Sequence, residues 1–254
     1  MNDTLRVAMS NAGETCESLA EKIRVDPKTV ARWLSPGRVP HPRHRKMAAD
    51  ILRQDVQKLW PNRRREMLWF RPWRDVEREA ISLRSYEPLV IPGLLQTPAY
   101  ARAVLAGAGL IGPEDVDGHV ISRIERQVIL ERTTPPVLTA VLDEGALRRG
   151  VGSPDVMREQ LLHLVDVAAE RPHVRVHIVP FSAGVYAGIN GPFVLADLAG
   201  PRVVAHLDNQ LSGQTVSDAA DVARLVSSWE SCRSEALPHR QSIELIREFA
   251  GTWN

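Results

Sequence analysis

Lys28, Thr29 and Arg32 are spaced so that they lie together on one face of a helix. Lysine and arginine can donate hydrogen bonds to guanine O6 and N7, and the methyl group of threonine can contact thymine. This chemistry requires that the helix enters the major groove of DNA, as the second helix of a helix-turn-helix does. The flanking residues must then have the types that a helix-turn-helix needs.

The segment before this face contains capping residues for two consecutive helices. Thr15 is placed to cap a first helix that runs to Ile23. Asp26 is placed as the N-cap of a second helix, with Pro27 at the first helical position, where its missing N–H removes no hydrogen bond. We expect the second helix to extend to Leu34.

Four apolar residues match the packing of this motif. Ala20 is small where the second helix would cross the first, and Val25 would fill the turn. Val30 and Trp33 would face inward. The turn usually contains glycine, which adopts a positive φ at little cost, but Arg24 stands there, so we expect an altered turn or a small strain. An ordinary helical hairpin is the alternative for the whole segment.

A basic segment interrupted by prolines follows the second helix. We interpret residues 37–45 (GRVPHPRHR), with Lys46, as a loop that contacts DNA phosphates and positions the protein without reading the sequence. A solvated basic loop is the alternative. His41 and His44 have no further ligands at metal-binding spacing, so we expect no metal site. The candidate DNA-binding residues are Thr15, Lys28, Thr29, Arg32, Arg38, Arg43, His44 and Arg45.

A second set of polar residues could line a pocket further along the chain. Asp143 and Glu144 follow a predicted strand, although a helix N-cap with a first-turn carboxylate is an alternative role for this pair. Residues 184–191 are rich in glycine and form either a flexible loop over a pocket or a turn between strands. Lone histidines on strands are commonly structural residues. The candidate pocket residues are Gln96, Tyr100, Asp143, Glu144, His177, Tyr186, Asn190 and His206.

The chain lacks the motifs of common enzyme classes. It contains no nucleophile elbow, no P-loop and no HExxH motif. Residues 107–112 (GAGLIG) match GxGxxG, but they follow the helix predicted over 98–106 and not a strand, so they are not a dinucleotide-binding glycine fingerprint. We therefore expect no catalytic residue, no cofactor and no metal ion, and an enzyme is only an alternative.

Charge is distributed unevenly along the 254 residues. Residues 1–75 contain 16 Lys and Arg against 9 Asp and Glu, a net charge of +7, whereas the remainder carries −6. A basic first part on an acidic body is typical of a DNA-reading head joined to a partner-binding domain. No apolar run reaches the ~20 residues of a transmembrane helix, and the N-terminus lacks the apolar core of a secretory signal. We expect a cytoplasmic protein without membrane association, in which Cys16 and Cys232 stay reduced.

Apolar periodicity predicts helices first and a mixture of helices and strands later. We expect a helix-turn-helix domain over 1–62, a linker over 63–75 docked through Trp69, Phe70 and Trp73 as an interdomain seam, and a ligand- or partner-binding domain over 76–254. The predicted fold class is α+β, with a small and mostly antiparallel sheet in the larger domain. Besides the motif, the predicted elements are helices over 4–12, 46–59, 76–85, 98–106, 113–131, 145–149, 154–169, 218–235 and 239–249, and strands over 137–142, 174–179, 193–197 and 203–207.

Two parts of the chain resemble known regulators. Residues 4–61 resemble XRE-type helix-turn-helix regulators through LAEKIRVDPKTVARWLSPGRVP. Residues 69–249 are similar to the C-terminal domain of actinobacterial, antitoxin-like transcriptional regulators through YEPLVIPGLLQTPAYARAVL, RIERQVIL, VLDEGALRRGVG, MREQLLHL, VRVHIVPFSAG and GPFVLAD. The resemblance implies a transcription regulator, often encoded beside a small partner protein. It implies no catalytic residue. For the C-terminal domain it is consistent with three roles: sensing a small molecule, binding a protein partner or dimerising.

Three functions are consistent with these patterns. The first is a regulator that binds specific double-stranded DNA as a homodimer, because one short recognition helix reads too few bases for genomic selectivity. The second is an enzyme that acts on a small molecule in the C-terminal domain of a regulator-like scaffold. The third is an antitoxin-like protein that binds a small partner protein. A deep polar pocket within residues 90–210 would favour the second function, and a shallow apolar surface would favour partner binding.

Overall fold

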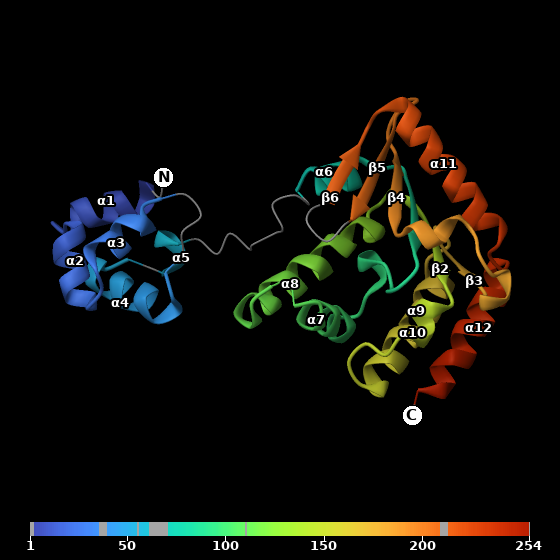
Figure 1. Ribbon diagram of the computed structural model, residues 1–254, viewed down its shortest axis with the longest axis horizontal. Coiled ribbons are helices and arrows are strands. Elements are labelled where there is room, and N and C mark those ends of the chain that lie inside the picture. The colour runs from blue at the N-terminus through green and yellow to red at the C-terminus, as the bar shows by residue number, and fades with distance from the viewer. Residues whose placement is uncertain are drawn as a thin grey trace. The chain divides into compact units, whose positions relative to one another are not determined.

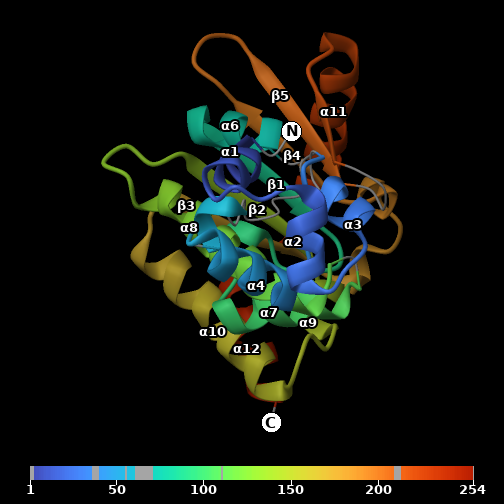
Figure 2. The same cartoon turned by 90° about the vertical axis from the view of Figure 1, so that its left-hand side faces the viewer.

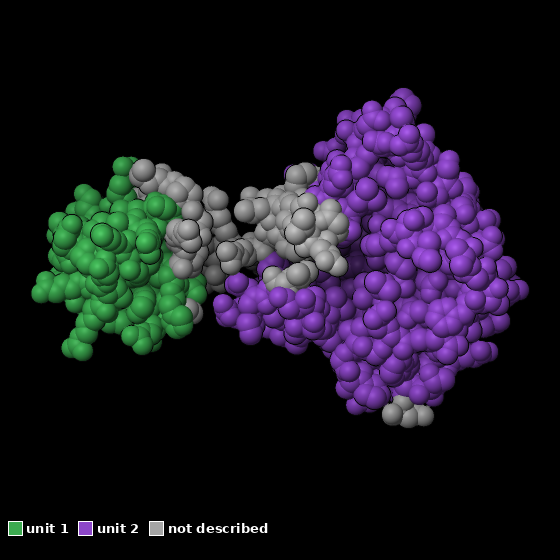
Figure 3. All heavy atoms as spheres, in the orientation of Figure 1, with its two compact units in different colours: residues 1–63 green, residues 64–254 purple. Residues whose placement is uncertain are grey.

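The computed structural model describes residues 3–35, 40–54, 56–60, 71–109, 111–208 and 213–253. The chain divides into two compact units, residues 1–63 and residues 64–254, which are coloured separately in Figure 3. The described part of the first unit is helical, and the second combines helices with a six-stranded sheet. The α+β class predicted from the sequence is therefore confirmed. In the part of the chain that the structure describes, no helix is long and apolar enough to cross a membrane.

Short helices pack around one apolar core in the first unit (Figure 1). Leu5, Leu19, Val30 and Leu59 are fully buried there. The helices are α1 (Asp3–Asn11), α2 (Cys16–Ile23), α3 (Pro27–Trp33), α4 (Pro42–Leu52) and α5 (Val56–Leu59).

The single helix predicted over 46–59 is wrong. α4 ends at Leu52, where Arg53 adopts the left-handed conformation with φ 48° and terminates the helix. This turn separates α4 from α5, so the chain reverses instead of continuing along the axis of α4. Trp60 is buried as a result, with its ring 6.3 Å from the ring of Trp33, centroid to centroid.

The second unit contains the remaining elements, in which η denotes a 3-10 helix. They are α6 (Arg71–Glu79), β1 (Ser82–Glu87), η2 (Gly93–Leu95), α7 (Pro98–Gly107), η3 (Pro113–Asp115), α8 (Val116–Arg126), η4 (Gln127–Glu131), β2 (Val137–Asp143), α9 (Gly145–Arg148), α10 (Pro154–Glu170), β3 (Val174–Val179), η5 (Phe181–Ala183), η6 (Ala187–Asn190), β4 (Phe193–Asp197), β5 (Val203–Asp208), β6 (Gly213–Val216), α11 (Ala219–Ser234) and α12 (His239–Thr252).

The strands form one sheet in the order β3-β2-β1-β4-β5-β6. β1 runs parallel to β2 and β2 parallel to β3, whereas the pairings β1–β4, β4–β5 and β5–β6 are antiparallel. Most of the pairings are therefore antiparallel, as predicted. The four predicted strands correspond to β2, β3, β4 and β5. The sequence patterns did not reveal β1 and β6.

β1 replaces the C-terminal part of the helix predicted over 76–85. α6 ends at Glu79, and the chain then enters the strand. Leu83 and Tyr86 are buried on opposite faces of the sheet, and Arg84 forms an ion pair with Asp197 of β4 at 2.8 Å. Because β1 is a central strand, burial on both faces and pairing along both edges outweigh the weak strand propensity of its residues.

Helices cover both faces of the sheet. Trp229 of α11 packs on the face that carries Tyr86 and Phe193. On the other face α10 and α12 lie side by side and pack on β3 (Figures 1 and 2). The helices α6, α7 and α8 of the second unit also carry buried side chains, among them Trp73, Tyr100 and Val120.

The residue Leu237 before α12 and the first residues of α12 cover the outer edge of β3. Leu237 N donates a hydrogen bond to Ile178 O at 2.8 Å, and Ser242 Oγ accepts one from Ile178 N at 3.0 Å. His239 Nδ1 accepts from Val176 N at 3.3 Å. These groups occupy positions that another strand would use, which protects the edge from further pairing.

The linker predicted over 63–75 extends too far, because α6 begins at Arg71. Trp73 is buried in the core of the second unit, and its ring stacks on His206 at 5.0 Å between centroids. Trp73 is therefore a core residue of the second unit and not the interdomain seam that we expected. Trp69 and Phe70 lie outside the described residues.

Candidate functional site

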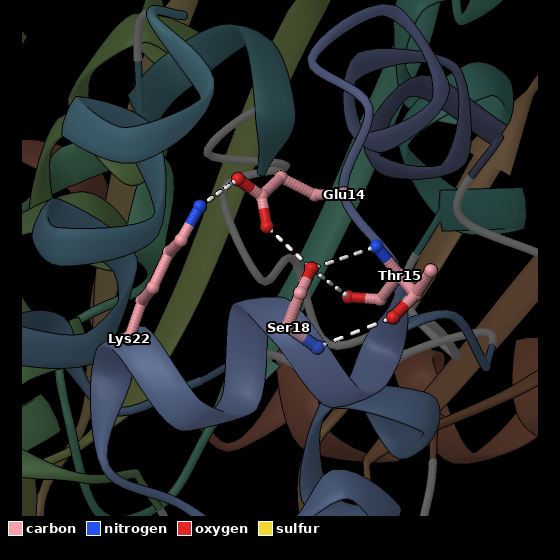
Figure 4. A network of polar contacts seen from close by, with 4 residues as sticks. All are labelled: Glu14, Thr15, Ser18 and Lys22. Atoms are coloured by element: carbon pink, nitrogen blue, oxygen red, sulfur yellow. Dashed lines mark hydrogen bonds and ion pairs between the residues drawn. The ribbon is translucent and has the colours of Figure 1, made fainter.

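Polar side chains fix the start of α2 (Figure 4). Thr15 Oγ1 accepts a hydrogen bond from Ser18 N at 3.2 Å, and Ser18 Oγ accepts one from Thr15 N at 2.9 Å. Glu14 accepts from the Ser18 hydroxyl and pairs with Lys22, which holds the pKa of the Glu14 carboxyl below its usual value. Thr15 is thus the N-cap of α2. Its hydroxyl, which we predicted to contact DNA, already accepts a hydrogen bond from the helix backbone.

α3 has a buried side and an exposed basic side. Val30 and Trp33 are buried in the core of the first unit. Lys28 and Arg32 are exposed, and Thr29 is partly buried. Two of the side chains that we predicted to read bases, Lys28 and Arg32, therefore lie opposite the residues that anchor the helix, whereas Thr29 lies beside the buried side.

Two residues start α3 in the way that the sequence predicted. The carboxylate of Asp26 accepts a hydrogen bond from Lys28 N at 2.8 Å, and Pro27 occupies the first helical position. This cap orders the backbone immediately before the exposed basic side chains.

Arg24 ends α2 in the left-handed conformation, with φ 62° and ψ 51°. That conformation costs a residue with a β-carbon about 1–2 kcal/mol. The backbone is held by two hydrogen bonds, from Arg24 N to Glu21 O at 3.2 Å and from Val25 N to Ala20 O at 3.0 Å. The position at which the sequence predicted strain therefore has a strained backbone.

Arg24→Gly should raise the free energy of unfolding of the first unit by about 1 kcal/mol relative to Arg24→Ala. Both variants lose the same charge, but only alanine keeps the β-carbon that disfavours a positive φ. Hydrogen exchange of the α2 and α3 amides in the full chain measures the difference. Equal protection of these amides in the two variants would contradict the strain.

The predicted basic loop is partly helical, because Pro42 begins α4 and places Arg43, Arg45 and Lys46 near its start. We read this proline as a break, but proline is well tolerated at the first position of a helix. His41 makes no side-chain hydrogen bond as the N-cap, and the first turn contains no acidic residue. Positive side chains at this end oppose the helix dipole.

His44 packs between helices. Its ring stacks on Trp33, with centroids 6.2 Å apart and an interplanar angle of 30°. Burial and the neighbouring Arg43 and His41 lower the pKa of His44, so the imidazole is neutral at pH 7. His44 therefore contributes packing and not the positive charge that a phosphate contact needs. Arg38, which we also predicted as a phosphate contact, lies outside the described residues.

Gln96 and Tyr100 belong to a buried network. The Gln96 side chain donates to Ile91 O at 2.6 Å and accepts from Arg123 Nη1 at 2.9 Å. Tyr100 Oη accepts from Ile91 N at 3.2 Å. Gln160 of α10 bonds the backbone on either side of Gln96. The two candidates therefore fix the η2 turn to its neighbouring helices.

Asp143, Tyr186 and Tyr86 form a chain of hydrogen bonds near the carboxyl ends of β1 and β2. Tyr186 Oη donates to Asp143 Oδ2 at 2.7 Å, and the two tyrosine hydroxyls are 2.7 Å apart. Asp143 Oδ1 accepts from Gly145 N at 2.7 Å. Burial raises the pKa of Tyr86 to about 12 and also raises that of Tyr186, so both phenols stay protonated. Sequence reasoning missed Tyr86 because it missed β1.

The glycine-rich residues 184–191 belong to the connection between β3 and β4, in which Ala187–Asn190 form the 3-10 helix η6. A β-carbon on Gly188 would lie 2.0 Å from Tyr86 Oη, so only glycine permits this close approach. Asn190 is exposed, and its amide donates to Ala187 O at 3.0 Å. The segment links two strands, as one of the two sequence interpretations held, but it contains η6 and not a simple turn, because β3 and β4 are not adjacent in the sheet.

Glu144 and His177 have structural partners. Glu144 precedes α9, and its carboxylate accepts from Phe181 N at 2.9 Å and from Arg148 Nε at 2.7 Å. His177 Nδ1 contacts Leu237 O at 3.0 Å, and burial lowers the pKa of this histidine.

A cluster of charged residues lies around His206, which is buried on β5. His206 Nε2 is 2.9 Å from Asp208 Oδ1. Glu77 of α6 is also buried and forms an ion pair with Arg126 of α8 at 3.0 Å. Burial raises the pKa of Glu77, although Arg126 opposes this change. Of this cluster the sequence analysis identified only His206.

The predicted pocket residues do not form one site. β3 and β5 are separated by three strands, so His177 and His206 lie far apart. The others lie beneath η2 and at the carboxyl end of β2: Gln96, Tyr100, Asp143, Glu144, Tyr186 and Asn190.

Comparison with known proteins identifies one family. Residues 70–248 match the model of a family described as a domain of unknown function, DUF5753. No curated protein and no solved structure matched the chain. Because the family match covers more than half of the sequence, the chain belongs to the DUF5753 family.

Proposed function

We propose that this protein is a sequence-specific, DNA-binding transcriptional regulator that acts in the cytoplasm. The observation that carries the proposal is the two-sided helix α3. Val30 and Trp33 anchor one side of it, while Lys28 and Arg32 are exposed on the other. In a helix-turn-helix the first turns of such a helix enter the major groove.

Charge supports the same proposal. Residues 1–75 carry a net charge of +7. Arg43 and Arg45 lie in the first turn of α4, where their charges oppose the helix dipole. A DNA phosphate near this end would be attracted by both the arginines and the helix N-terminus, which offsets that cost.

The protein would bind DNA as a homodimer, since one recognition helix contacts too few base pairs for selectivity in a genome. Large apolar side chains are exposed in the connection between β3 and β4, where Phe181, Val185 and Ile189 are 56%, 87% and 73% exposed. Exposed apolar groups that cluster in this way are typical of protein contacts. The second unit would dimerise and respond to a ligand or a partner.

The resemblance to XRE-type regulators points in the same direction. It rests on residues 19–40, which include α3 and the turn before it. The sequence similarity of the second unit to antitoxin-like regulators adds a sensing role for that unit.

A genome-wide DNA pull-down tests this function. The full chain is compared with a variant in which Lys28, Thr29 and Arg32 are all replaced by alanine. We expect discrete peaks for the unmodified protein and their loss in the variant, because the direct base contacts are gone. Circular dichroism of both proteins shows whether the first unit stays folded. An absence of peaks for the unmodified protein would refute the proposal.

A further inference from the structure

The ends of β1 and β5 bring two carboxyl groups to the same edge and face of the sheet. Ser85 pairs with Val194, and Val194 pairs with His206, so these three side chains share one face. Glu87 and Asp208 each follow two residues later and therefore lie on that face as well. Their strands are separated by β4, which places the two backbones on the order of 10 Å apart.

α8 brings two arginines to this region. A β-carbon on Gly93 would lie 2.7 Å from Arg126 Nη2 and 3.7 Å from Arg123 Cδ, so both side chains lie against the η2 turn. Arg126 is engaged in the ion pair with Glu77. Electrostatic interactions couple Glu87 to both arginines and to Asp208.

Among the described residues, no ion pair matches the charge of Arg123. Its guanidinium donates to the neutral amide oxygen of Gln96 at 2.9 Å, and in the described part of the chain no ion pair joins it to Glu87 or Asp208. Burial lowers the pKa of Arg123 to about 10, so it is still charged at neutral pH. A partly buried guanidinium has further N–H donors for an acceptor from outside.

Glu87 does not neutralise this charge. Burial, with the nearby charge of Asp208, raises the pKa of Glu87 to about 8, so at neutral pH most of this carboxyl is protonated. In that form it can donate a hydrogen bond to an anion. Asp208, whose negative charge also acts on Arg123, is half exposed and contacts His206.

We propose that Arg123, with Glu87 beside it, forms a binding site for the oxyanion group, a carboxylate or phosphate, of a small-molecule effector. The planar guanidinium suits both groups because its parallel N–H donors match two oxygens of one anion. Only the role of this ligand as an effector rests on the proposed DNA-binding function. Anion binding is measured without DNA. A failure of the anion site can therefore be distinguished from a failure of the proposed DNA binding.

Thermal unfolding of the full chain tests the site with two probes, inorganic phosphate and succinate, at pH 7. Sodium chloride at matched ionic strength is the reference. We expect at least one probe to stabilise the protein beyond this reference, and Arg123→Met to weaken its binding by about tenfold or more. Whichever probe binds more tightly distinguishes a phosphate from a carboxylate ligand.

Three further variants complete the test. Arg158→Met, which removes an exposed arginine of α10, should bind like the unmodified protein. Arg123→Lys, which keeps the charge without the planar fork, should retain part of the affinity. Glu87→Gln should bind the anion at pH 7 and also above pH 8. In the unmodified protein, anion binding should weaken above pH 8, because Glu87 then ionises and its negative charge opposes the attraction of Arg123 and Arg126. No stabilisation by either probe, or equal loss in the Arg123→Met and Arg158→Met variants, would overturn the proposal.

Discussion

Replacing Arg126 by methionine should lower the free energy of unfolding of the second unit by about 3–5 kcal/mol. Glu77 is only 3% exposed, and its carboxylate forms an ion pair with Arg126 Nε at 3.0 Å. Without the arginine, the buried carboxyl keeps its hydrogen bond with Trp73 but loses its ion pair, so it either carries a poorly compensated charge or takes up a proton. Both outcomes cost stability, and they do so in a unit whose net stability is only of this order or a few times larger.

Hydrogen exchange of the β1 and β2 amides measures this loss for the second unit alone. Arg102→Met is the matched control, because Arg102 pairs with Asp117 on the surface, where both side chains are more than half exposed. An exposed pair contributes at most about 1 kcal/mol, so the control should change little. Similar losses in the two variants would show that burial of the Glu77–Arg126 pair is not important.

A double variant separates the pair from its surroundings. Glu77→Leu combined with Arg126→Met removes both charges and leaves apolar side chains in their place. It should be more stable than Arg126→Met alone, because no buried carboxyl is left without its ion-pair partner. A double variant that loses the sum of the two single effects would contradict a direct coupling.

Local signals were sufficient to predict α2 and α3 of the first unit. Thr15 and Asp26 cap α2 and α3 as expected, and Pro27 occupies the first position of α3. Arg24 adopts the positive φ that the turn requires. These features depend on residues within one helical turn of each other, so the sequence contains the relevant information. Prolines were ambiguous, since Pro42 starts a helix where we expected a loop.

The central strand could not be predicted in this way. β1 is stabilised by β2 and β4, which begin at Val137 and Phe193, far along the chain. Neither partner affects the local pattern of residues 82–87, whose Ser and Arg residues are poor strand formers. The error also concealed Tyr86 and Glu87, because side chains cannot be assigned to a sheet face before their strand is known.

The buried charges were missed for a similar reason. Charged residues are almost always exposed unless they are paired, and the partner of Glu77 lies on another helix. One signal was present in the sequence: Glu77 follows Trp73 by four residues and thus shares the buried face of α6. A charge on an apolar helix face predicts a buried partner but does not identify it. Arg123 and Arg126 could be placed only after α8 was seen to pack against the η2 turn.

The two arginines of the first unit should affect DNA binding in different ways. Arg32→Ala should weaken binding to the protein's own operator by about 1–3 kcal/mol, or roughly 5- to 150-fold, and leave binding to unrelated DNA almost unchanged. Arg43→Ala should weaken binding to both DNAs by similar factors and reduce the slope of log affinity against log salt concentration by about 1. The difference follows from their positions, because Arg32 is exposed on α3 and Arg43 lies at the start of α4.

Fluorescence anisotropy with the operator from the pull-down and with a scrambled duplex, each at several salt concentrations, measures both effects. Arg158→Ala removes the same charge from α10 of the second unit and should leave both affinities and the salt slope unchanged. Operator affinity that survives Arg32→Ala would mean that α3 does not read bases. A phosphate contact cannot distinguish one sequence from another. If Arg43→Ala reduces only operator binding, α4 therefore reads bases, and the role of phosphate contact that we assign to Arg43 is wrong.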